Sequence, residues 1–189
     1  EKLSLKLEIQ KDIKILLKIL KESTMKFTNE YLKSLKELID KFDKKSINEL
    51  VKQLSKLKKN NGRLFIIGVG GSAGNASHAV NDFRKICELE CYAPTDNVSE
   101  LTARTNDEGW SNSLFPYLKV SKLTKKDAIL IFSVGGGNKK KNISTNIINA
   151  IDFAKKKKSK VFAILGKSDG YAALKSDCCF ILPKTKKLY

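Results

Sequence analysis

Several residue types on which protein function often depends are scarce in this chain. It has one histidine, three prolines and four cysteines. Cys87 and Cys91 stand four residues apart and Cys178 and Cys179 are adjacent, so neither pair has the two-residue gap of a zinc ribbon or redox motif. We therefore expect reduced thiols and a cytoplasmic location. The uncharged apolar runs are about as long as a strand, and the start is charged and helical, which predicts neither a membrane span nor a signal peptide.

Basic residues are abundant, and they give the chain a formal net charge of +17. Only Arg63, Arg84 and Arg104 are arginines, and the lysines are spread over nearly every predicted surface. Proteins that read base edges or grip phosphates with two parallel hydrogen bonds depend on arginine. We interpret the charge as a solvated lysine surface that would attract an anionic substrate, and we expect neither nucleic acid nor a membrane as a partner.

Residues 1–60 are predicted to form a helical segment ahead of the main domain. Apolar residues recur at steps of three and four through 1–22 and again through 28–57, as they do on one face of a helix. A break is expected near 43–46, where Ser46 and Glu49 have the spacing of a capping box. These helices carry more apolar surface than one sheet needs covered, so we expect them to pack on a neighbouring subunit.

Residues 61–189 alternate between strand-like and helix-like patterns. The apolar runs typical of strands are 64–67, 128–132, 161–165 and 179–182. The amphipathic stretches between them are 72–89, 98–105, 111–120 and 142–155. Nearly all-apolar strands separated by helices predict an α/β fold, a three-layer sandwich with a central parallel β-sheet. Ligands of such sheets bind beyond the carboxyl ends of the strands.

Two of these strands end in turns rich in glycine and serine. One turn begins at Gly68 and leads into a helix, and the other, 133–138, contains three consecutive glycines. Glycine lets a backbone approach a ligand closely, and the free N–H groups of a first helical turn favour an anion. A phosphate-bearing ligand held between the turns is the leading hypothesis, and tight turns with small residues kept for packing are the alternative. The first turn fits neither glycine-rich fingerprint of the nucleotide-binding folds.

The only histidine, His78, stands four residues before Asp82 on the helix predicted after the first turn. This spacing places both side chains on one face of a helix. Such a pair suits a shared metal, or a histidine electrophile beside a carboxylate base, in a reaction that moves a proton. A hydrogen-bonded surface pair is the alternative, and the glycine turn just ahead of His78 favours a functional role.

In their order and spacing these motifs resemble the sugar isomerase (SIS) domain, and within it the phosphoheptose isomerase group. The resemblance covers about residues 61–183; its marks are 68–73 with His78, then 95–109, 133–138, 166–170 and 176–177. It implies a flavodoxin-like SIS domain preceded by N-terminal helices that serve oligomerisation. It also implies an enzyme that interconverts sedoheptulose 7-phosphate and D-glycero-D-manno-heptose 7-phosphate through an enediolate, for heptose and surface polysaccharide (lipopolysaccharide or capsule) biosynthesis.

The resemblance further implies partners and roles for individual residues. We expect a homotetramer with active sites at subunit junctions and, as in several members, bound zinc (Zn2+). His78 and Asp82 would be the catalytic pair and the metal ligands, with Asp82 one methylene shorter than the glutamate of the family. The residues expected to bind the substrate are Val69, Gly70, Gly71, Ser72, Asn106, Asp107, Ser133, Val134, Gly135 and Asn138.

This chain departs from the family at several of these positions. Val69 replaces the usual asparagine, and Val134 and Gly135 replace hydroxyl-bearing residues of the phosphate loop. Phosphate binding would therefore rely on Ser133 and on backbone N–H groups. The family also continues into a helix with a second histidine and a glutamine or glutamate partner, so we expect the chain, which stops at Tyr189, to lack that C-terminal helix.

These departures keep other functions open. One alternative is a non-catalytic SIS-domain protein, which binds a sugar phosphate as a regulator or takes part in DNA replication. Another is an isomerase or epimerase that acts on a different phosphorylated sugar. Turnover of sedoheptulose 7-phosphate is the observation that would separate these readings.

Overall fold

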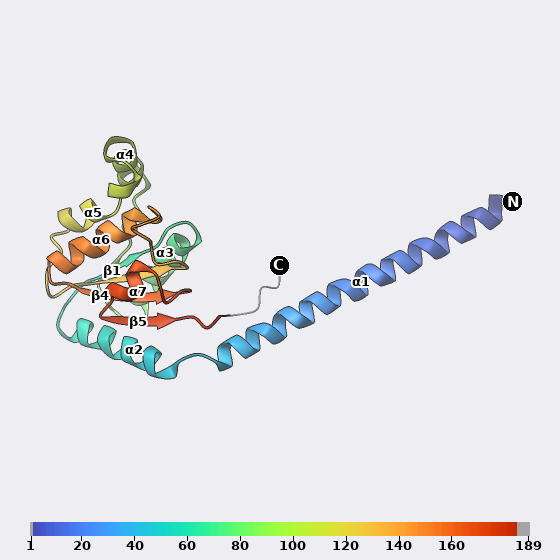
Figure 1. Cartoon of the computed structure of the whole chain (residues 1–189), viewed down its shortest axis with the longest axis horizontal. Coiled ribbons are helices and arrows are strands. Elements are labelled where there is room, and N and C mark those ends of the chain that lie inside the picture. Colours follow the sequence, from blue (N-terminus) through green and yellow to red (C-terminus); the bar gives the residue numbers. More distant parts are fainter. Residues whose placement is uncertain (1, 185–189) are drawn as a thin grey trace. The chain divides into compact units, whose positions relative to one another are not determined.

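The computed structural model describes residues 2–184, with their side chains from residue 11 onward, and divides the chain into two compact units (Figure 1). One unit includes α1 (Lys2–Asp40), a single long helix. The other unit, Asp43–Leu182, contains the sheet and the remaining helices. No helix in the described part of the chain is both long and apolar enough to cross a membrane.

The α1 helix runs without interruption through residues 23–27, so the gap predicted there between two helices was wrong. Thr24 Oγ1 donates to the carbonyl oxygen of Leu20 at 2.8 Å, and Thr28 Oγ1 donates to that of Thr24 at 3.0 Å. Such bonds to the preceding turn satisfy a hydroxyl inside a helix. These two threonines are therefore compatible with one continuous helix.

The second helix, α2 (Lys44–Lys59), belongs to the compact unit of the sheet. Asp43 caps it by accepting a hydrogen bond from a backbone N–H of its first turn at 2.9 Å. The chain breaks near the predicted position, but the N-cap is Asp43 rather than Ser46. Leu50 and Leu57 are buried among residues of the sheet. The expectation that the apolar face of this helix packs on a neighbouring subunit was therefore wrong for these two side chains.

One parallel sheet forms the centre of this unit. Its strands are β1 (Leu64–Ile67), β2 (Cys91–Tyr92), β3 (Ala128–Ser133), β4 (Lys160–Leu165) and β5 (Cys178–Ile181). They lie in the order β2-β1-β3-β4-β5, and every neighbouring pair in the described residues is parallel. The four strands predicted from the sequence are confirmed to within one residue at each end, and the two-residue β2 was not predicted.

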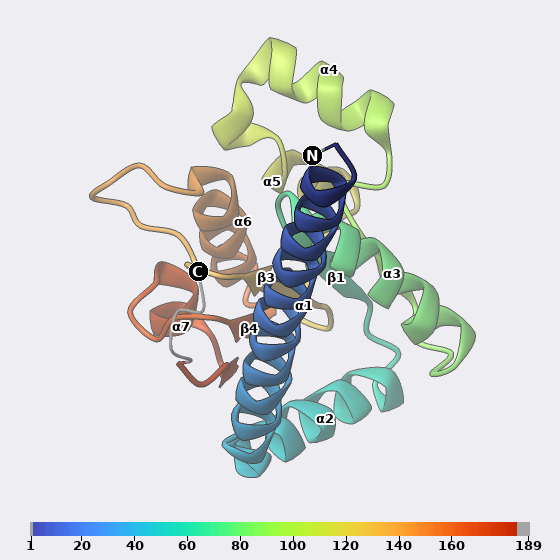
Figure 2. The same ribbon diagram turned by 90° about the vertical axis from the view of Figure 1, so that its right-hand side faces the viewer.

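Helices cover both faces of the sheet, which confirms the three-layer sandwich (Figure 2). Side chains of a strand point alternately to its two faces. Leu64 and Ile66 accordingly pack with α2 and α3 (Gly71–Lys85), whereas Phe65 and Ile67 pack in the opposite layer. That second layer is built from α5 (Phe115–Val120), α6 (Thr145–Lys156) and α7 (Tyr171–Lys175). The strand order is that of flavodoxin-like folds.

Outside these layers lies α4 (Val98–Glu108), followed by the short 3-10 helix η1 (Trp110–Asn112). None of the side chains of α4 is buried, although Leu101 packs partly against the core. In both views α4 stands at the margin of the sheet unit, beyond α5 (Figures 1 and 2). Most polar residues of α4 are exposed, whereas Glu100, Arg104 and Thr105 are half-buried.

Candidate active site

The strand order places a crevice at the carboxyl ends of β1 and β3. These neighbouring strands continue into opposite layers, because β1 leads into α3 on one face and β3 leads toward α6 on the other. In open α/β sheets, ligands bind at such a reversal of strand order. The two turns rich in glycine begin there, at Gly68 and at Ser133.

The first turn holds α3 close to the end of β1. A Cβ atom built on Gly68 would lie 2.2 Å from the carbonyl oxygen of Ser72, so a larger residue at Gly68 would collide with backbone. Gly70 is the N-cap, and no side chain caps the helix within residues 11–184. The N–H groups of its first turn therefore remain available to an anion.

Backbone hydrogen bonds from the start of α7 hold the second turn in place. The N–H of Tyr171 donates to the Gly137 carbonyl at 2.9 Å, and that of Ala172 donates to the Gly136 carbonyl at 2.8 Å. Ser133 Oγ accepts from the N–H of Gly136 at 3.0 Å. Gly137 has a φ of 82°, a left-handed conformation that favours glycine. The turn is therefore a defined loop, shaped before any ligand arrives.

A cavity of about 350 Å³ lies between the two turns. Its size falls in the range of small-molecule sites. It is lined by Ser72, Asn75, Phe132, Ser133, Val134, Ile164, Gly166 and Leu182. The structure thus brings Ser72 together with Ser133 and Val134, as expected of turns at the same edge of a sheet.

Five of the lining residues were not singled out as site residues from the sequence, among them Phe132, which directly precedes Ser133 on β3. Asn75 follows Ser72 by three positions on α3, so its place on the same helical face could have been inferred from spacing. Gly166 directly follows β4. Because ligands bind at the carboxyl ends of parallel strands, its position after a third strand could have marked it as a site residue. Ile164 and Leu182 carry no local pattern that distinguishes them from core residues.

The histidine–carboxylate pair lies outside this cavity, further along α3. His78 Nε2 is 3.5 Å from Asp82 Oδ2, and the two side chains are 77% and 48% exposed. Asn81 Nδ2 also donates to Asp82 Oδ1 at 3.1 Å. The pair is therefore formed on one helical face, as the spacing predicted, and both side chains are open to solvent in the single chain.

Other predicted binding residues also stand apart from the cavity lining. Asn106 and Asp107 are exposed on α4, where Asn106 Nδ2 donates to Asp107 Oδ1 at 2.8 Å. Asn138 is exposed, and its Oδ1 accepts from the Lys141 N–H at 3.0 Å. Val69 is half-buried and packs against the core. Their roles in binding remain predictions from the resemblance.

The donors near the cavity do not by themselves make a zinc centre. Zinc in proteins takes three or four protein ligands, mainly histidine nitrogen, cysteine sulfur and carboxylate oxygen. No group of three or more such side chains comes together within the described residues. His78 and Asp82 supply two donors on one helical face, and a zinc ion there would need ligands beyond this pair.

Lys139, which follows the glycine-rich loop 133–138, is held by an ion pair with Asp152. Lys139 Nζ lies 2.8 Å from Asp152 Oδ2, and the Tyr171 hydroxyl also donates to Asp152. Burial alone would raise the pKa of Asp152, but the bonds from Lys139 and Tyr171 outweigh it and lower that pKa below its usual value. The interaction ties the residue after Asn138 to α6 and α7.

The sequence model of the SIS domain family, described as "SIS domain", matches residues 26–166. The chain belongs to the SIS domain family. The match includes both glycine-rich turns, the helix of His78 and Asp82, and the whole of α4.

Curated relatives and solved structures agree with this assignment. The phosphoheptose isomerase of Pelodictyon phaeoclathratiforme is 28% identical over 160 residues, which are 81% of this chain and 72% of that protein. The phosphoheptose isomerase of Thermodesulfovibrio yellowstonii is 30% identical over 142 residues, 72% of this chain and 67% of that one. The solved phosphoheptose isomerase of Neisseria gonorrhoeae superposes with a TM-score of 0.72 at 23% identity, covering 88% of each chain.

Proposed function

We propose that this SIS-domain protein is a phosphoheptose isomerase, which interconverts sedoheptulose 7-phosphate and D-glycero-D-manno-heptose 7-phosphate. The observation that carries the proposal is the match to curated phosphoheptose isomerases over more than four-fifths of the chain. The cavity between the two glycine-rich turns supports it, because its walls offer hydroxyls and helix N–H groups suited to a phosphorylated sugar. The proposed setting is cytoplasmic biosynthesis of heptose for surface polysaccharides.

The phosphate group would lie between Ser72 and Ser133. Both serines line the cavity, and Asn75 is the other lining residue with a polar side chain. Val134 is 70% exposed and brings no hydroxyl, so donors along the glycine-rich loop would be N–H groups. Successive N–H groups in such a turn form a concave anion site. Binding of the phosphate thus depends on loop geometry more than on side-chain charge.

The proton transfer is assigned to the pair on α3. An aldose–ketose isomerisation moves a proton between C1 and C2 through an enediolate, so it needs a base at carbon and an acid at oxygen. We assign the base to Asp82 and the oxygen-directed acid to His78, which stands 3.5 Å away. Because α3 starts at the phosphate cavity, one rigid element would position both the anchor and the reactive pair.

We also propose, from the family resemblance alone, that the protein binds zinc. The proton transfer assigned above to Asp82 and His78 does not depend on it. His78 and Asp82 would provide two of its ligands, and a bound zinc would polarise the sugar oxygens. Activity assays with and without added zinc would show whether the metal contributes.

We further propose that the protein acts as a homo-oligomer, with a tetramer as the expected state. Large apolar side chains of α1 are 41–60% exposed; they include Ile13, Leu16, Leu20, Phe27, Leu32, Leu35 and Ile39. A helix with so much exposed apolar surface marks an association site. His78, Asp82, Asn106 and Asp107 lie outside the cavity of one chain, which fits a site completed by a second subunit.

The direct test is turnover of sedoheptulose 7-phosphate by the purified protein, with and without zinc. Formation of D-glycero-D-manno-heptose 7-phosphate is expected. Absence of product together with thermal stabilisation by the substrate would instead support a non-catalytic binding protein. Turnover of another phosphorylated sugar alone would keep the reaction class and change the substrate.

A further inference from the structure

Asp152, on the exposed side of α6, joins two residues that belong to either side of the glycine-rich loop 133–138. Lys139 directly follows the loop, and its Nζ lies 2.8 Å from Asp152 Oδ2. The hydroxyl of Tyr171, the first residue of α7, donates to Asp152 Oδ1. We call Lys139, Asp152 and Tyr171 the loop clamp. None of the three lines the cavity between the two turns.

Each side chain of the loop clamp contacts both of the others. Lys139 Nζ lies 4.5 Å from the centroid of the Tyr171 ring, a position in which a cation is attracted to an aromatic face. The hydrogen bond to Asp152 also raises the pKa of Lys139 above its ordinary value. A single exposed ion pair stabilises a protein little. Here three mutual contacts fix three segments of the chain relative to one another.

Tyr171 also reaches the loop through its backbone. Its N–H donates to the Gly137 carbonyl at 2.9 Å, and the N–H of Ala172 donates to the Gly136 carbonyl at 2.8 Å. The helix α7 that supplies these donors has only five residues, too few to be stable by themselves. Its position therefore depends on tertiary contacts, and the bond from Tyr171 to Asp152 is one of them.

The helix that carries Asp152 is firmly anchored. Five apolar side chains of α6 are at most 2% exposed: Ile147, Ile148, Ala150, Ile151 and Ala154. Side chains packed in this way hold a helix in a fixed place. The loop clamp thus fastens the glycine-rich loop to an element of the core.

The glycine-rich loop has few other means of holding its shape. Ser133 carries the only hydroxyl of residues 133–138, and three glycines follow in succession. Glycine permits many backbone conformations, whereas a concave anion site requires successive N–H groups to point the same way. A loop of this composition needs external contacts to stay in one conformation.

We propose that Asp152 is a positioning residue of the isomerase. Through Lys139 and Tyr171 it holds loop 133–138 in the conformation that receives the phosphate group of the substrate. This role rests on the proposed function for the identity of the ligand, whereas the fastening of the loop does not depend on it.

The test compares the full chain with its variants Asp152→Ala and Tyr171→Phe. Tyr171→Phe removes only the hydroxyl and keeps the ring and the backbone donor. Amide hydrogen exchange in residues 133–138, measured without ligand, should become about three- to tenfold faster in both, the effect of one exposed hydrogen bond. KM for sedoheptulose 7-phosphate should rise by a similar factor, while kcat stays within about twofold of the parent.

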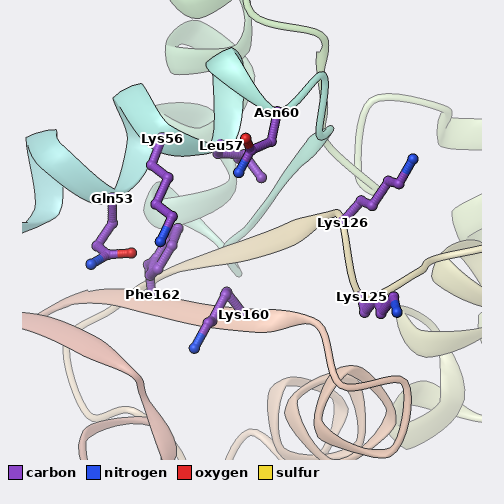
Figure 3. A pocket seen from close by; sticks show the side chains of 8 residues that line it. All are labelled: Gln53, Lys56, Leu57, Asn60, Lys125, Lys126, Lys160 and Phe162. Atoms are coloured by element: carbon purple, nitrogen blue, oxygen red, sulfur yellow. The ribbon is translucent and has the colours of Figure 1, made fainter.

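Two control variants make matched changes away from the loop. Tyr92→Phe removes a hydroxyl that donates to Glu90 Oε1 at 2.9 Å, so it also breaks a bond from tyrosine to a carboxylate. Lys126→Gln is the control for Lys139→Gln. The Lys126 side chain points away from Lys56 at the amino end of β3 (Figure 3) and has no ion pair within residues 11–184. Both controls should leave loop exchange and KM unchanged, and Lys139→Gln should raise both.

Two further variants separate positioning from a general loss of stability. Asp152→Asn keeps an oxygen that accepts from the Tyr171 hydroxyl, so its KM should lie between those of the parent and Asp152→Ala. The double variant Asp152→Ala with Tyr171→Phe should match Asp152→Ala alone, because the hydroxyl acts through Asp152.

Unchanged loop exchange and KM in Asp152→Ala would overturn the proposal. Exchange that becomes faster throughout α6 and the sheet, or effects of Asp152→Ala and Tyr171→Phe that simply add, would overturn it as well. Faster loop exchange in a protein whose parent does not turn over sedoheptulose 7-phosphate would support the fastening of the loop and contradict the proposed function.

Discussion

His78 Nε2 lies 3.5 Å from Asp82 Oδ2 across one turn of α3, on the helix whose first turn also borders the cavity lined by Ser72 and Ser133. A contact between residues four apart depends only on the helix and needs no other part of the fold. The cavity needs α3, β3, β4 and the residue after β5 together. The proposed catalytic pair thus depends on local helix geometry and the proposed phosphate site on tertiary packing, but α3 contributes to both.

Replacement of Asp82 by asparagine should remove the proposed base while leaving its size unchanged. We expect kcat to fall by about 10²- to 10⁴-fold, the usual contribution of a general base, with a much smaller change in KM. Asp82→Glu is the matched variant, because it restores a carboxylate one methylene longer and should keep measurable activity. Unchanged kcat in Asp82→Asn would take Asp82 out of the mechanism.

Ser133→Ala should weaken phosphate binding. The variant loses a hydroxyl at the cavity and the bond from Ser133 Oγ to the N–H of Gly136. We expect KM to rise by about three- to tenfold, the effect of one hydrogen bond to a charged group, while kcat changes less. Ser55→Ala on the exposed side of α2 should leave both constants unchanged. An unaltered KM in Ser133→Ala would move the phosphate elsewhere.

Gly68 and Gly74 form a natural pair for a stability measurement. Alanine at Gly68 would place its Cβ 2.2 Å from a backbone oxygen, whereas alanine at Gly74 would meet nothing within 4 Å. Gly68→Ala should lower the free energy of unfolding by about 1–3 kcal/mol. Gly74→Ala should raise it by about 0.5–1 kcal/mol, because alanine is the better helix former. Urea denaturation of both variants checks this, and equal stabilities would contradict the close approach.

The buried Asp127 should make stability depend on acid. Burial alone would raise the pKa of Asp127, but hydrogen bonds from Arg63 and Thr124 outweigh it and hold that pKa below its usual value. A lowered folded-state pKa contributes stability above the unfolded pKa of about 3.9, and the contribution is lost as pH falls through the folded value. Unfolding free energies measured between about pH 7 and pH 3 should therefore decline below about pH 4.

Asp127→Asn provides the matched comparison. It removes the charge that pairs with the Arg63 guanidinium at 2.9 Å, so we expect a loss of about 3–5 kcal/mol at pH 7 and a weaker dependence on acid. Asp169→Asn, at an exposed position, should change neither quantity. An acid profile of Asp127→Asn parallel to that of the parent would assign the dependence to other carboxylates.

The exposed apolar face of α1 should control association. Leu16→Gln with Leu20→Gln makes that face polar and keeps good helix formers, so the protein should sediment as a smaller species. The control, Lys14→Gln with Lys21→Gln, alters exposed polar positions of the same helix and should keep the parent mass in analytical ultracentrifugation. Loss of association in both variants, or in neither, would contradict the assignment of the interface to the apolar face.

Much of the fold could be predicted because its signals are local. The strands β1, β3, β4 and β5 are short apolar runs, and such runs are easily recognised in a sequence. β2 was missed because it has two residues, too few for a period. The gap predicted inside α1 was wrong because Thr24 and Thr28 satisfy their hydroxyls within the helix, and composition does not reveal such bonds.

The candidate site was predicted in part, for the same reason. Ser72 and Ser133 could be placed at one edge because parallel strands end together. Ile164 and Leu182 could not, since their contact with the cavity depends on how β4 and the residues after β5 pack. Asn106 and Asp107 were expected to bind substrate by resemblance, and in a single chain they stand on α4, exposed.

The sequence by itself determined most of the elements, the two glycine-rich turns and the spacing of His78 and Asp82, because each depends on residues within a few positions of one another. Only the tertiary structure decided which distant residues meet. The order β2-β1-β3-β4-β5 places Ser72 beside Ser133 at one end of the sheet. Strand order is set by how both faces of the sheet bury their apolar side chains together, a property of the whole core rather than of any segment.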